Sequence, residues 1–163
     1  NATVTTVAPT GTISIIADCS AGIEPLYGIH LVRSVMDGMT LRSVHPEFVR
    51  QAAVHGLALG PLQQDLERSE SIQHLTQIPE SLRRLFITAH DVSPSHHVHI
   101  QAAFQRYSDS GVSKTINLPV TATLQDVAEA FQLAHRLGCK GLTVFRSGSR
   151  SHQVLSCSHV QSC

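Results

Sequence analysis

A strand–helix–strand pattern between residues 112 and 145 constrains the fold of this chain most strongly. Residues 112–118 alternate imperfectly between apolar and polar side chains and end at a proline, as a strand does. Thr123 is a good N-cap for the next segment, in which apolar residues keep one helical face until Gly138. Residues 141–145 form a second apolar strand. Strands joined in this way lie parallel and buried, so the sequence predicts an α/β fold.

Upstream of this unit the sequence predicts a strand, a hairpin and several helices. The β-branched residues 2–7 form a strand that ends at a turn containing Pro9 and Gly11, whereas residues 13–18 are too short to separate helix from strand. Residues 36–38 separate two apolar runs and indicate a hairpin. The two strands of the hairpin are expected at residues 29–35 and 39–44. Helices are expected at residues 46–56 and 62–68, and two more are expected to begin at Pro79 and at Ser93. The helix from Pro79 is expected to bury one apolar face, made of Leu82, Leu85, Phe86 and Ala89.

Charge and hydropathy argue against two classes of partner. Twelve Lys and Arg balance twelve Asp and Glu, so the chain lacks the basic surface that nucleic acid or an anionic membrane attracts. No apolar run approaches the ~18 to 20 residues that span a bilayer, and no secretory segment opens the chain. The four cysteines lack C-x-x-C spacing and the density of a disulfide scaffold. We therefore expect a cytoplasmic protein with reduced thiols that binds neither nucleic acid nor membrane.

The turn Pro9-Thr10-Gly11-Thr12-Ile13 is the first candidate binding site. If a helix follows this turn, its first N–H groups and the hydroxyls of Thr10, Thr12 and Ser14 would face a phosphate without needing a lysine. The alternative is a plain connection between a strand and a helix.

Three other groups of residues could carry chemistry. Glu24 lies in a tight loop bounded by Pro25, where a hydrogen bond that stabilises the loop competes with acid–base catalysis. His96 and His99 share a helical face that could hold a metal, but no third ligand accompanies them, and surface histidines are the alternative. Cys157 and Cys163 could exchange a disulfide or be terminal thiols without a role, whereas Cys19 and Cys139 are expected to be small buried residues.

Four segments in collinear order resemble one family. The segments are TVAPTGTISIIADCSAGIEPLYG, VRSVMDG, RRLFITAHDVSPSHHVHIQAAFQRYSDSGVSKTINLP and GCKGLTVFRSGSR. They are similar to the C-terminal part of the adenosylcobalamin-dependent (class II, vitamin B12-dependent) ribonucleotide reductases, over residues 1 to about 155. The resemblance implies that residues 1–150 are the C-terminal portion of the ten-stranded α/β barrel of these enzymes and that residues 151–163 are a flexible Cys/Ser/His tail.

The resemblance also implies roles for particular residues. Pro9, Thr10, Gly11, Thr12 and Ile13 match the segment that binds the substrate diphosphate in the family. The loop from Ser20 to Pro25 matches the family's S-G-I-E-P loop beside the active site, with Ala21 where the family often has Ser. Cys157 and Cys163 match, at a wider spacing, a C-terminal pair that passes reducing equivalents from thioredoxin.

In the family, adenosylcobalamin generates a thiyl radical on a cysteine, and the ribose 2′-hydroxyl of a ribonucleotide is replaced by hydrogen. This sequence contains no N-x-C-x-E loop, so the radical machinery would lie upstream of Asn1 and the isolated chain should be inactive. The remainder of the barrel is then a required partner, and a homodimer is possible because an open part of a barrel exposes strand edges and apolar surface. The alternative function is a non-catalytic remnant that acts as an interaction or metal-binding module.

The chain departs from the family pattern at three places. Ser95-His96-His97 stands where the family has E-W-H, Asp109-Ser110-Gly111 where it has D-N-A, and Arg146-Ser147-Gly148-Ser149-Arg150 where it has R-D-G-S-R. Loss of a large inward aromatic at residue 96 is expected to leave a cavity or admit water.

Overall fold

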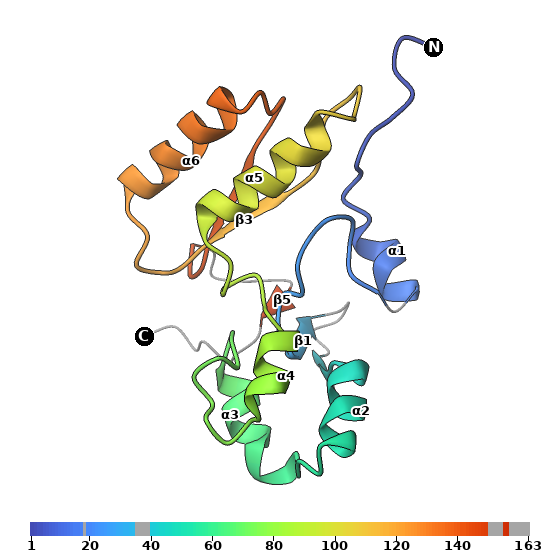
Figure 1. Ribbon diagram of the computed structural model, residues 1–163, viewed down its shortest axis with the longest axis vertical. Coiled ribbons are helices and arrows are strands. Elements are labelled where there is room, and N and C mark those ends of the chain that lie inside the picture. Colours follow the sequence, from blue (N-terminus) through green and yellow to red (C-terminus); the bar gives the residue numbers. More distant parts are fainter. Residues whose placement is uncertain (18, 35–39, 150–154, 157–163) are drawn as a thin grey trace. The chain divides into compact units, whose positions relative to one another are not determined.

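The computed structural model describes residues 1–17, 19–34, 40–149 and 155–156. The chain forms two compact units (Figure 1). Unit 1 comprises residues 1–25 and 92–149, and unit 2 comprises residues 26–91 with the described part of 150–163. Residues 26–91 of unit 2 are therefore inserted in the sequence between the two segments of unit 1. None of the helices in the described ranges is both long and apolar enough to cross a bilayer.

Unit 1 contains the predicted strand–helix–strand pattern. Strands β3 (Thr115–Leu118) and β4 (Thr143–Arg146) pair in parallel, and α6 (Leu124–Arg136) connects them. α6 begins where expected because the Thr123 side chain accepts from the Asp126 N–H while the Asp126 carboxylate accepts from the Thr123 N–H. Its end is followed by Gly138 at φ 75°, the left-handed conformation that glycine adopts at little cost. The α/β prediction for this segment is confirmed.

Helix α5 (Pro94–Gln105) packs beside α6 and against β3 (Figure 1). Ser93 caps its start, as the sequence indicates, by accepting from the His96 N–H. The core between these helices and the two strands consists of Val98, Ile116, Leu118, Ala130 and Ala134. The buried Gln101 amide donates to the carbonyls of Val112 and Gly141, which ties α5 to the segments that lead into both strands.

The predicted strand at residues 2–7 is wrong apart from its last residue. Only Val7 forms a bridge, a parallel one with Val112. The N–H groups of Val4 and Thr5 instead donate to the Asp109 carboxylate, at 3.1 and 3.2 Å. A side chain thus occupies donors that a strand would present to a neighbouring strand. The ambiguous segment that follows is helix α1 (Gly11–Ile16).

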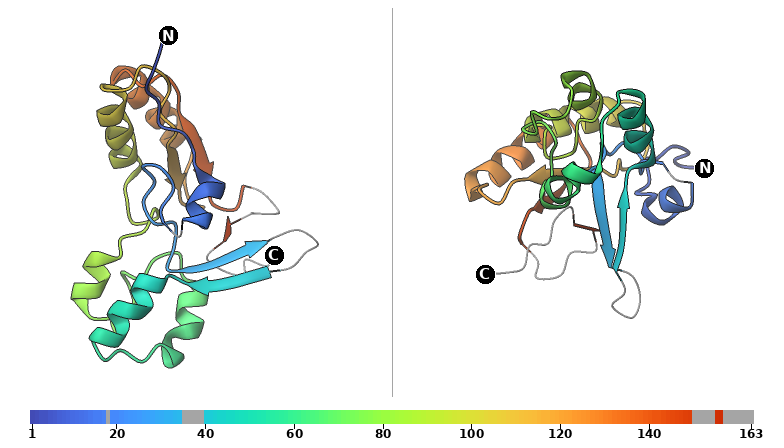
Figure 2. Two further views of the ribbon diagram at one scale, coloured as in Figure 1. Left: turned by 90° about the vertical axis from the view of Figure 1, so that its right-hand side faces the viewer. Right: turned by 90° about the horizontal axis from the view of Figure 1, so that it is seen from below.

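Unit 2 contains the predicted hairpin. Strands β1 (His30–Ser34) and β2 (Thr40–Val44) pair antiparallel, with His30 opposite Val44 (Figure 2). The predicted connection at residues 36–38 lies outside the described residues. Strand β5 (Leu155–Ser156) adds to the other edge of β1, also antiparallel. The predicted tail at residues 151–163 otherwise lies outside the described residues.

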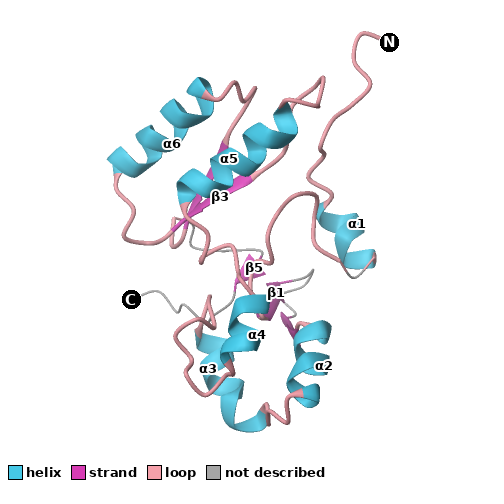
Figure 3. Ribbon diagram, in the orientation of Figure 1, coloured by secondary structure: helices cyan, strands magenta, loops and turns pink. Residues whose placement is uncertain are grey.

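Three helices and a 3-10 turn complete unit 2 (Figure 3). They are α2 (Pro46–Val54), the 3-10 helix Gly60–Leu62, α3 (Gln63–Arg68) and α4 (Glu80–Leu85). The apolar face predicted for α4 is partly wrong, because the chain leaves the helix at Phe86 and Leu85 is 59% exposed. Leu82, Phe86 and Ala89 are buried as expected.

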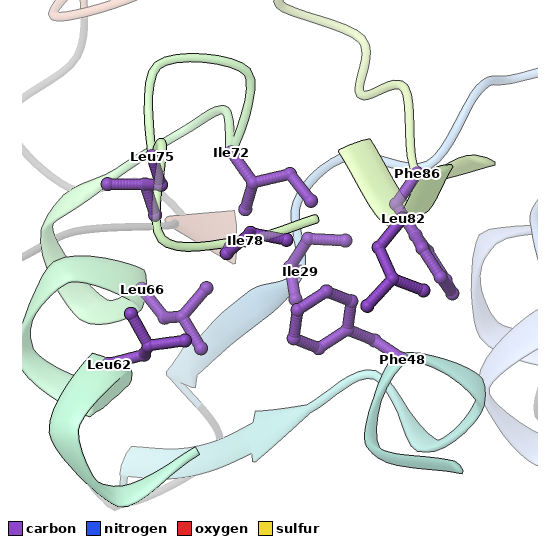
Figure 4. Packing of buried hydrophobic residues seen from close by; sticks show 9 residues of the cluster. All are labelled: Ile29, Phe48, Leu62, Leu66, Ile72, Leu75, Ile78, Leu82 and Phe86. Carbon is purple, nitrogen blue, oxygen red and sulfur yellow. The ribbon is translucent and has the colours of Figure 1, made fainter. Parts of the chain in front are cut away.

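The core of unit 2 is made of residues from β1's start, the helices and the loop between α3 and α4 (Figure 4). The side chains are Ile29, Phe48, Leu62, Leu66, Ile72, Leu75, Ile78, Leu82 and Phe86. The Phe48 and Phe86 rings meet edge to face, with centroids 5.1 Å apart. The two ends of the insertion meet outside this core, where the Ala89 N–H donates to the Leu26 carbonyl at 2.7 Å.

We predict that Phe48→Ala destabilises unit 2 by about 3 to 5 kcal/mol, because it removes a fully buried ring and leaves a cavity beside Phe86. Urea denaturation followed through NMR signals of residues 26–91 measures the change. The neighbouring Val49→Ala, on the exposed side of α2, serves as the control and should cost less than about 1 kcal/mol. Equal losses in the two variants would contradict this description of the core.

Candidate functional site

The Pro9 turn, residues 9–13, joins the N-terminal segment to α1. Thr10 has a φ of 52°, and it is the one non-glycine residue with positive φ among the described residues. A β-branched side chain in this left-handed region is a strained outlier that costs about 1 to 2 kcal/mol. Such strain is found where the surrounding structure enforces it, often at functional sites.

The Pro9 turn presents backbone donors on an accessible surface. Gly11, Thr12 and Ile13 are exposed, and Thr10 is half-buried. The Ser14 N–H donates to the Thr10 carbonyl at 3.0 Å and starts the helical pattern, so the N–H groups before it have no acceptor within the helix. The first turn of α1 carries no acidic side chain. The structure therefore brings all the predicted substrate-binding residues into one exposed turn.

A second segment, the Glu24 loop (residues 19–25), lies against the Pro9 turn. Gly22 also has a φ of 52°. A Cβ atom placed on Gly22 would lie 3.2 Å from the Ala8 carbonyl oxygen and 3.7 Å from the Thr10 Oγ1 atom. Only glycine combines this backbone conformation with this close approach. The loop therefore packs against the Thr10 side chain and against Ala8, the residue that precedes the Pro9 turn.

Glu24 holds its loop to β3. Its Oε2 atom accepts from the Lys114 Nζ atom at 2.5 Å, and its Oε1 atom accepts from the Thr115 N–H at 2.5 Å. Lys114 is only 2% exposed, and its Nζ atom also donates to the Thr115 carbonyl. A buried ammonium requires a charged partner at this distance. The interpretation of Glu24 as a residue that stabilises its loop is confirmed.

The sequence interpretation missed Lys114. The residue sits inside a segment expected to be a buried strand, and the chain contains only one other lysine, Lys140. A lysine in a buried strand needs an acidic partner, which is a signal that could have been used. The sequence did not show which carboxylate it contacts, because Glu24 is 90 residues away.

The histidine segment of α5 is arranged differently from the expectation. His96 is exposed and His97 is buried, so the predicted inward position at residue 96 is wrong. His99 is exposed, and its Nδ1 atom lies 2.8 Å from the Ser95 carbonyl oxygen. Within the described ranges, no three His, Cys, Asp or Glu side chains gather in a way that could hold a metal ion.

The cysteines form no pair in the part of the chain that the structure describes. Cys19 is exposed, contrary to the expectation that it is buried, because it lies in the loop after α1. Cys139 is partly buried, and burial raises the pKa of its thiol. Cys157 and Cys163 lie outside the described residues.

A family model described as "Ribonucleotide reductase, barrel domain" matches residues 1–145. The chain belongs to this family. The ribonucleotide reductase resemblance and the α/β fold of the barrel are thereby confirmed. The match includes the Pro9 turn, the Glu24 loop and β3.

Several curated relatives of this ribonucleotide reductase barrel segment are vitamin B12-dependent enzymes. The chain is 45% identical over 156 residues to a vitamin B12-dependent ribonucleoside-diphosphate reductase of Thermoplasma acidophilum. It is 43% identical over the same length to one of Mycobacterium tuberculosis. These alignments cover 96% of the chain but only 20% and 22% of the relatives, so the chain spans about a fifth of their length.

A solved structure shows the same fold. It is the alpha subunit of the class Id ribonucleotide reductase of Actinobacillus ureae, and it matches with a TM-score of 0.69 at 22% sequence identity. The match covers 86% of this chain and 26% of that subunit. The segment therefore adopts the fold found in part of a larger reductase subunit.

We predict that the amides of Val4 and Thr5 are released from the Asp109 carboxylate in acid. Hydrogen bonds from the Val4 N–H and then from Thr5 lower the pKa of the Asp109 carboxyl. Because the folded pKa lies below the unfolded value of about 3.9, this stabilisation is present above that pH and is lost as the pH falls through the folded pKa. Amide NMR signals of Val4 and Thr5 should shift toward random-coil positions during an acid titration.

Asp109→Ala should give random-coil amide positions for Val4 and Thr5 at every pH. The control is Asp126→Ala, because the pKa of Asp126 is also lowered but its carboxylate contacts Thr123 rather than the N-terminal segment. Native shifts for Val4 and Thr5 in Asp109→Ala would contradict the role of Asp109.

Proposed function

We propose that the protein to which these residues belong is a vitamin B12-dependent ribonucleotide reductase, and that Pro9, Thr10, Gly11, Thr12 and Ile13 bind the diphosphate of its substrate. The observation that carries the assignment is the Pro9 turn, whose backbone donors are exposed at the start of a helix. The names and similarity of the relatives support the reaction class.

The chemistry of the Pro9 turn suits a diphosphate. The N–H groups of Gly11, Thr12 and Ile13 are free of helical acceptors, and a diphosphate offers several anionic oxygens to them. The exposed Thr12 hydroxyl adds a further donor. No carboxylate in the first turn of α1 repels the anion. Recognition of phosphate through backbone donors needs no lysine or arginine at the turn.

The reduction itself requires groups that this sequence does not contain. Replacement of the ribose 2′-hydroxyl by hydrogen needs a radical initiator and two electrons, and adenosylcobalamin supplies the radical chemistry in such enzymes when bound. The sequence has no N-x-C-x-E loop, the feature that carries the radical cysteine in the family. Residues 1–163 alone are therefore expected to be inactive.

The remainder of the barrel is the proposed partner of this segment. α1 exposes Ile13 and Ile16, at 61% and 80%, and in the described part of unit 1 β3 and β4 pair only with each other. Exposed apolar side chains and unpaired strand edges are what further strands and helices of a barrel would cover. Cys157 and Cys163, the proposed redox pair that would exchange with thioredoxin, lie outside the described residues.

Titration with cytidine diphosphate, followed by the amide NMR signals of residues 9–14, tests the binding assignment. The titration uses the intact protein to which these residues belong. Changes concentrated at these amides are expected. Saturable binding that leaves these amides unmoved would place the diphosphate elsewhere, and absence of binding would favour a non-catalytic interaction module.

We predict that Gly11→Val abolishes binding of cytidine diphosphate without unfolding the protein. No atom lies within 4 Å of a Cβ placed on Gly11, and its φ is not positive, so the fold accepts the side chain. The branched side chain would occupy the space through which a phosphate approaches the N–H groups. Calorimetry measures the binding, and circular dichroism checks the fold. Gly60→Val, at another glycine with open space, is the control and should bind normally. Unchanged binding by Gly11→Val would overturn the site.

A further inference from the structure

We infer that Glu24 and Lys114 are positioning residues for the Pro9 turn, acting through Gly22 to hold Thr10 in its left-handed conformation. This inference rests on the proposed function of the Pro9 turn, but it concerns residues that do not touch the diphosphate. The chain of contacts runs from β3 to Glu24, then through the Glu24 loop to Gly22, and from Gly22 to the Pro9 turn.

Thr10 cannot hold its own conformation. A threonine strongly prefers negative φ, so an unsupported turn would populate the observed φ of 52° only as a minor state. No hydrogen bond within the turn explains the preference, because the Thr10 carbonyl serves as an ordinary first acceptor for the Ser14 N–H. The conformation must therefore be enforced by what packs against the turn.

Gly22 is the part of the Glu24 loop that packs there. Its own positive φ brings the loop so close to the Ala8 carbonyl and the Thr10 Oγ1 atom that a side chain at residue 22 would be strained and would press on Ala8. If Gly22 moved away, the space beside Thr10 would open. The peptide that follows Thr10 carries the Gly11 N–H, so a change in the backbone angles of Thr10 would redirect that donor.

The position of Gly22 depends on an anchor two residues later. The Glu24 carboxylate uses both oxygens, one on the buried Lys114 ammonium and one on the Thr115 N–H. The bidentate contact fixes the loop to the end of a strand whose neighbouring residues Ile116 and Leu118 are fully packed in the core. The rigidity of β3 is thereby transmitted to the Pro9 turn.

Loss of the anchor should weaken nucleotide binding by a factor that follows from the population of the turn. If only a minor fraction of molecules holds the binding-competent turn, the apparent dissociation constant rises by the inverse of that fraction. Because a non-glycine residue populates positive φ at a few per cent, loss of the anchor should raise the Kd for cytidine diphosphate by on the order of tenfold or more.

The test removes the anchor without leaving a buried charge. Glu24→Ala/Lys114→Met, made in the intact protein, deletes both charges and keeps the apolar part of the lysine side chain. We expect calorimetry with cytidine diphosphate to show the tenfold rise in Kd. The matched control is Glu47→Ala/Arg50→Met, which deletes an ion pair of unit 2 and should leave Kd unchanged.

Rescue separates positioning from a general loss of structure. Thr10→Gly added to the anchor variant should recover most of the lost affinity, because glycine populates positive φ about as readily as negative φ. In the parent, Thr10→Gly measures what the Thr10 side chain itself contributes to binding, and the rescued variant is compared with it. If the anchor variant binds like the parent, or if Thr10→Gly restores nothing, the inference is wrong.

A second variant covers the case in which the anchor variant fails to fold. Gly22→Ala keeps Glu24 and Lys114 but places a methyl group 3.2 Å from the Ala8 carbonyl oxygen. It should raise Kd to a similar extent, and Thr10→Gly should again restore binding. Normal binding by Gly22→Ala would overturn the inference.

A measurement without nucleotide distinguishes failure of this inference from failure of the proposed function. Amide NMR shifts of residues 10–13 in the free protein should change in Gly22→Ala and in the anchor variant. If the parent does not bind cytidine diphosphate, the proposed function fails, whereas shifts that move in this way still support the positioning role. Unmoved shifts would refute the positioning role whatever the nucleotide does.

Discussion

The ion pair between Glu24 and Lys114 connects the two segments on which the candidate site depends. One segment is the loop that touches the Pro9 turn, and the other is β3 in the core of unit 1. Because Lys114 is buried, removal of the carboxylate alone would leave an unpaired charge and cost about 3 to 5 kcal/mol. The same burial that makes the pair costly to break makes its geometry well defined, which a surface pair would not provide.

Residues 26–91 of unit 2 separate the two segments of unit 1 in the sequence, so the contacts that complete unit 1 join residues far apart in the chain. Residues 26–91 form their own core and bring their ends together through the hydrogen bond from Ala89 to Leu26. The closed insertion keeps the two segments of unit 1, 1–25 and 92–149, near one another. Their association therefore costs less chain entropy than it would across an unstructured insertion. The contacts that complete unit 1 all join these segments: Val7 with Val112, Thr5 with Asp109, and Glu24 with Lys114.

Local signals in the sequence predicted the elements whose causes are local. α6 is specified by the Thr123 capping box and the glycine after it, and the hairpin of unit 2 by the interruption between two apolar runs. The failures have non-local causes. Residues 2–7 carry the composition of a strand, but their donors bond to Asp109, which follows more than 100 residues later. The partner of Glu24 could not be predicted for the same reason. The lysine inside a buried strand indicated only that an acidic partner was required.

The backbone geometry of the Pro9 turn is the part of the candidate site that the sequence did not reveal. The sequence places Gly11 in the turn, yet Gly11 lies in the first turn of α1 and the positive φ values belong to Thr10 and Gly22. A threonine in that conformation contradicts its own propensity, so no local rule could have predicted it. In the proposed site this contradiction would have a physical function: Gly11 would keep the approach to the N–H groups open, while the neighbouring loop would enforce the conformation that aims them. Phosphate access at Gly11 and the backbone conformation of Thr10 would then be governed by different residues. The turn could be both rigid and exposed, which a turn relying on its own glycine would not achieve.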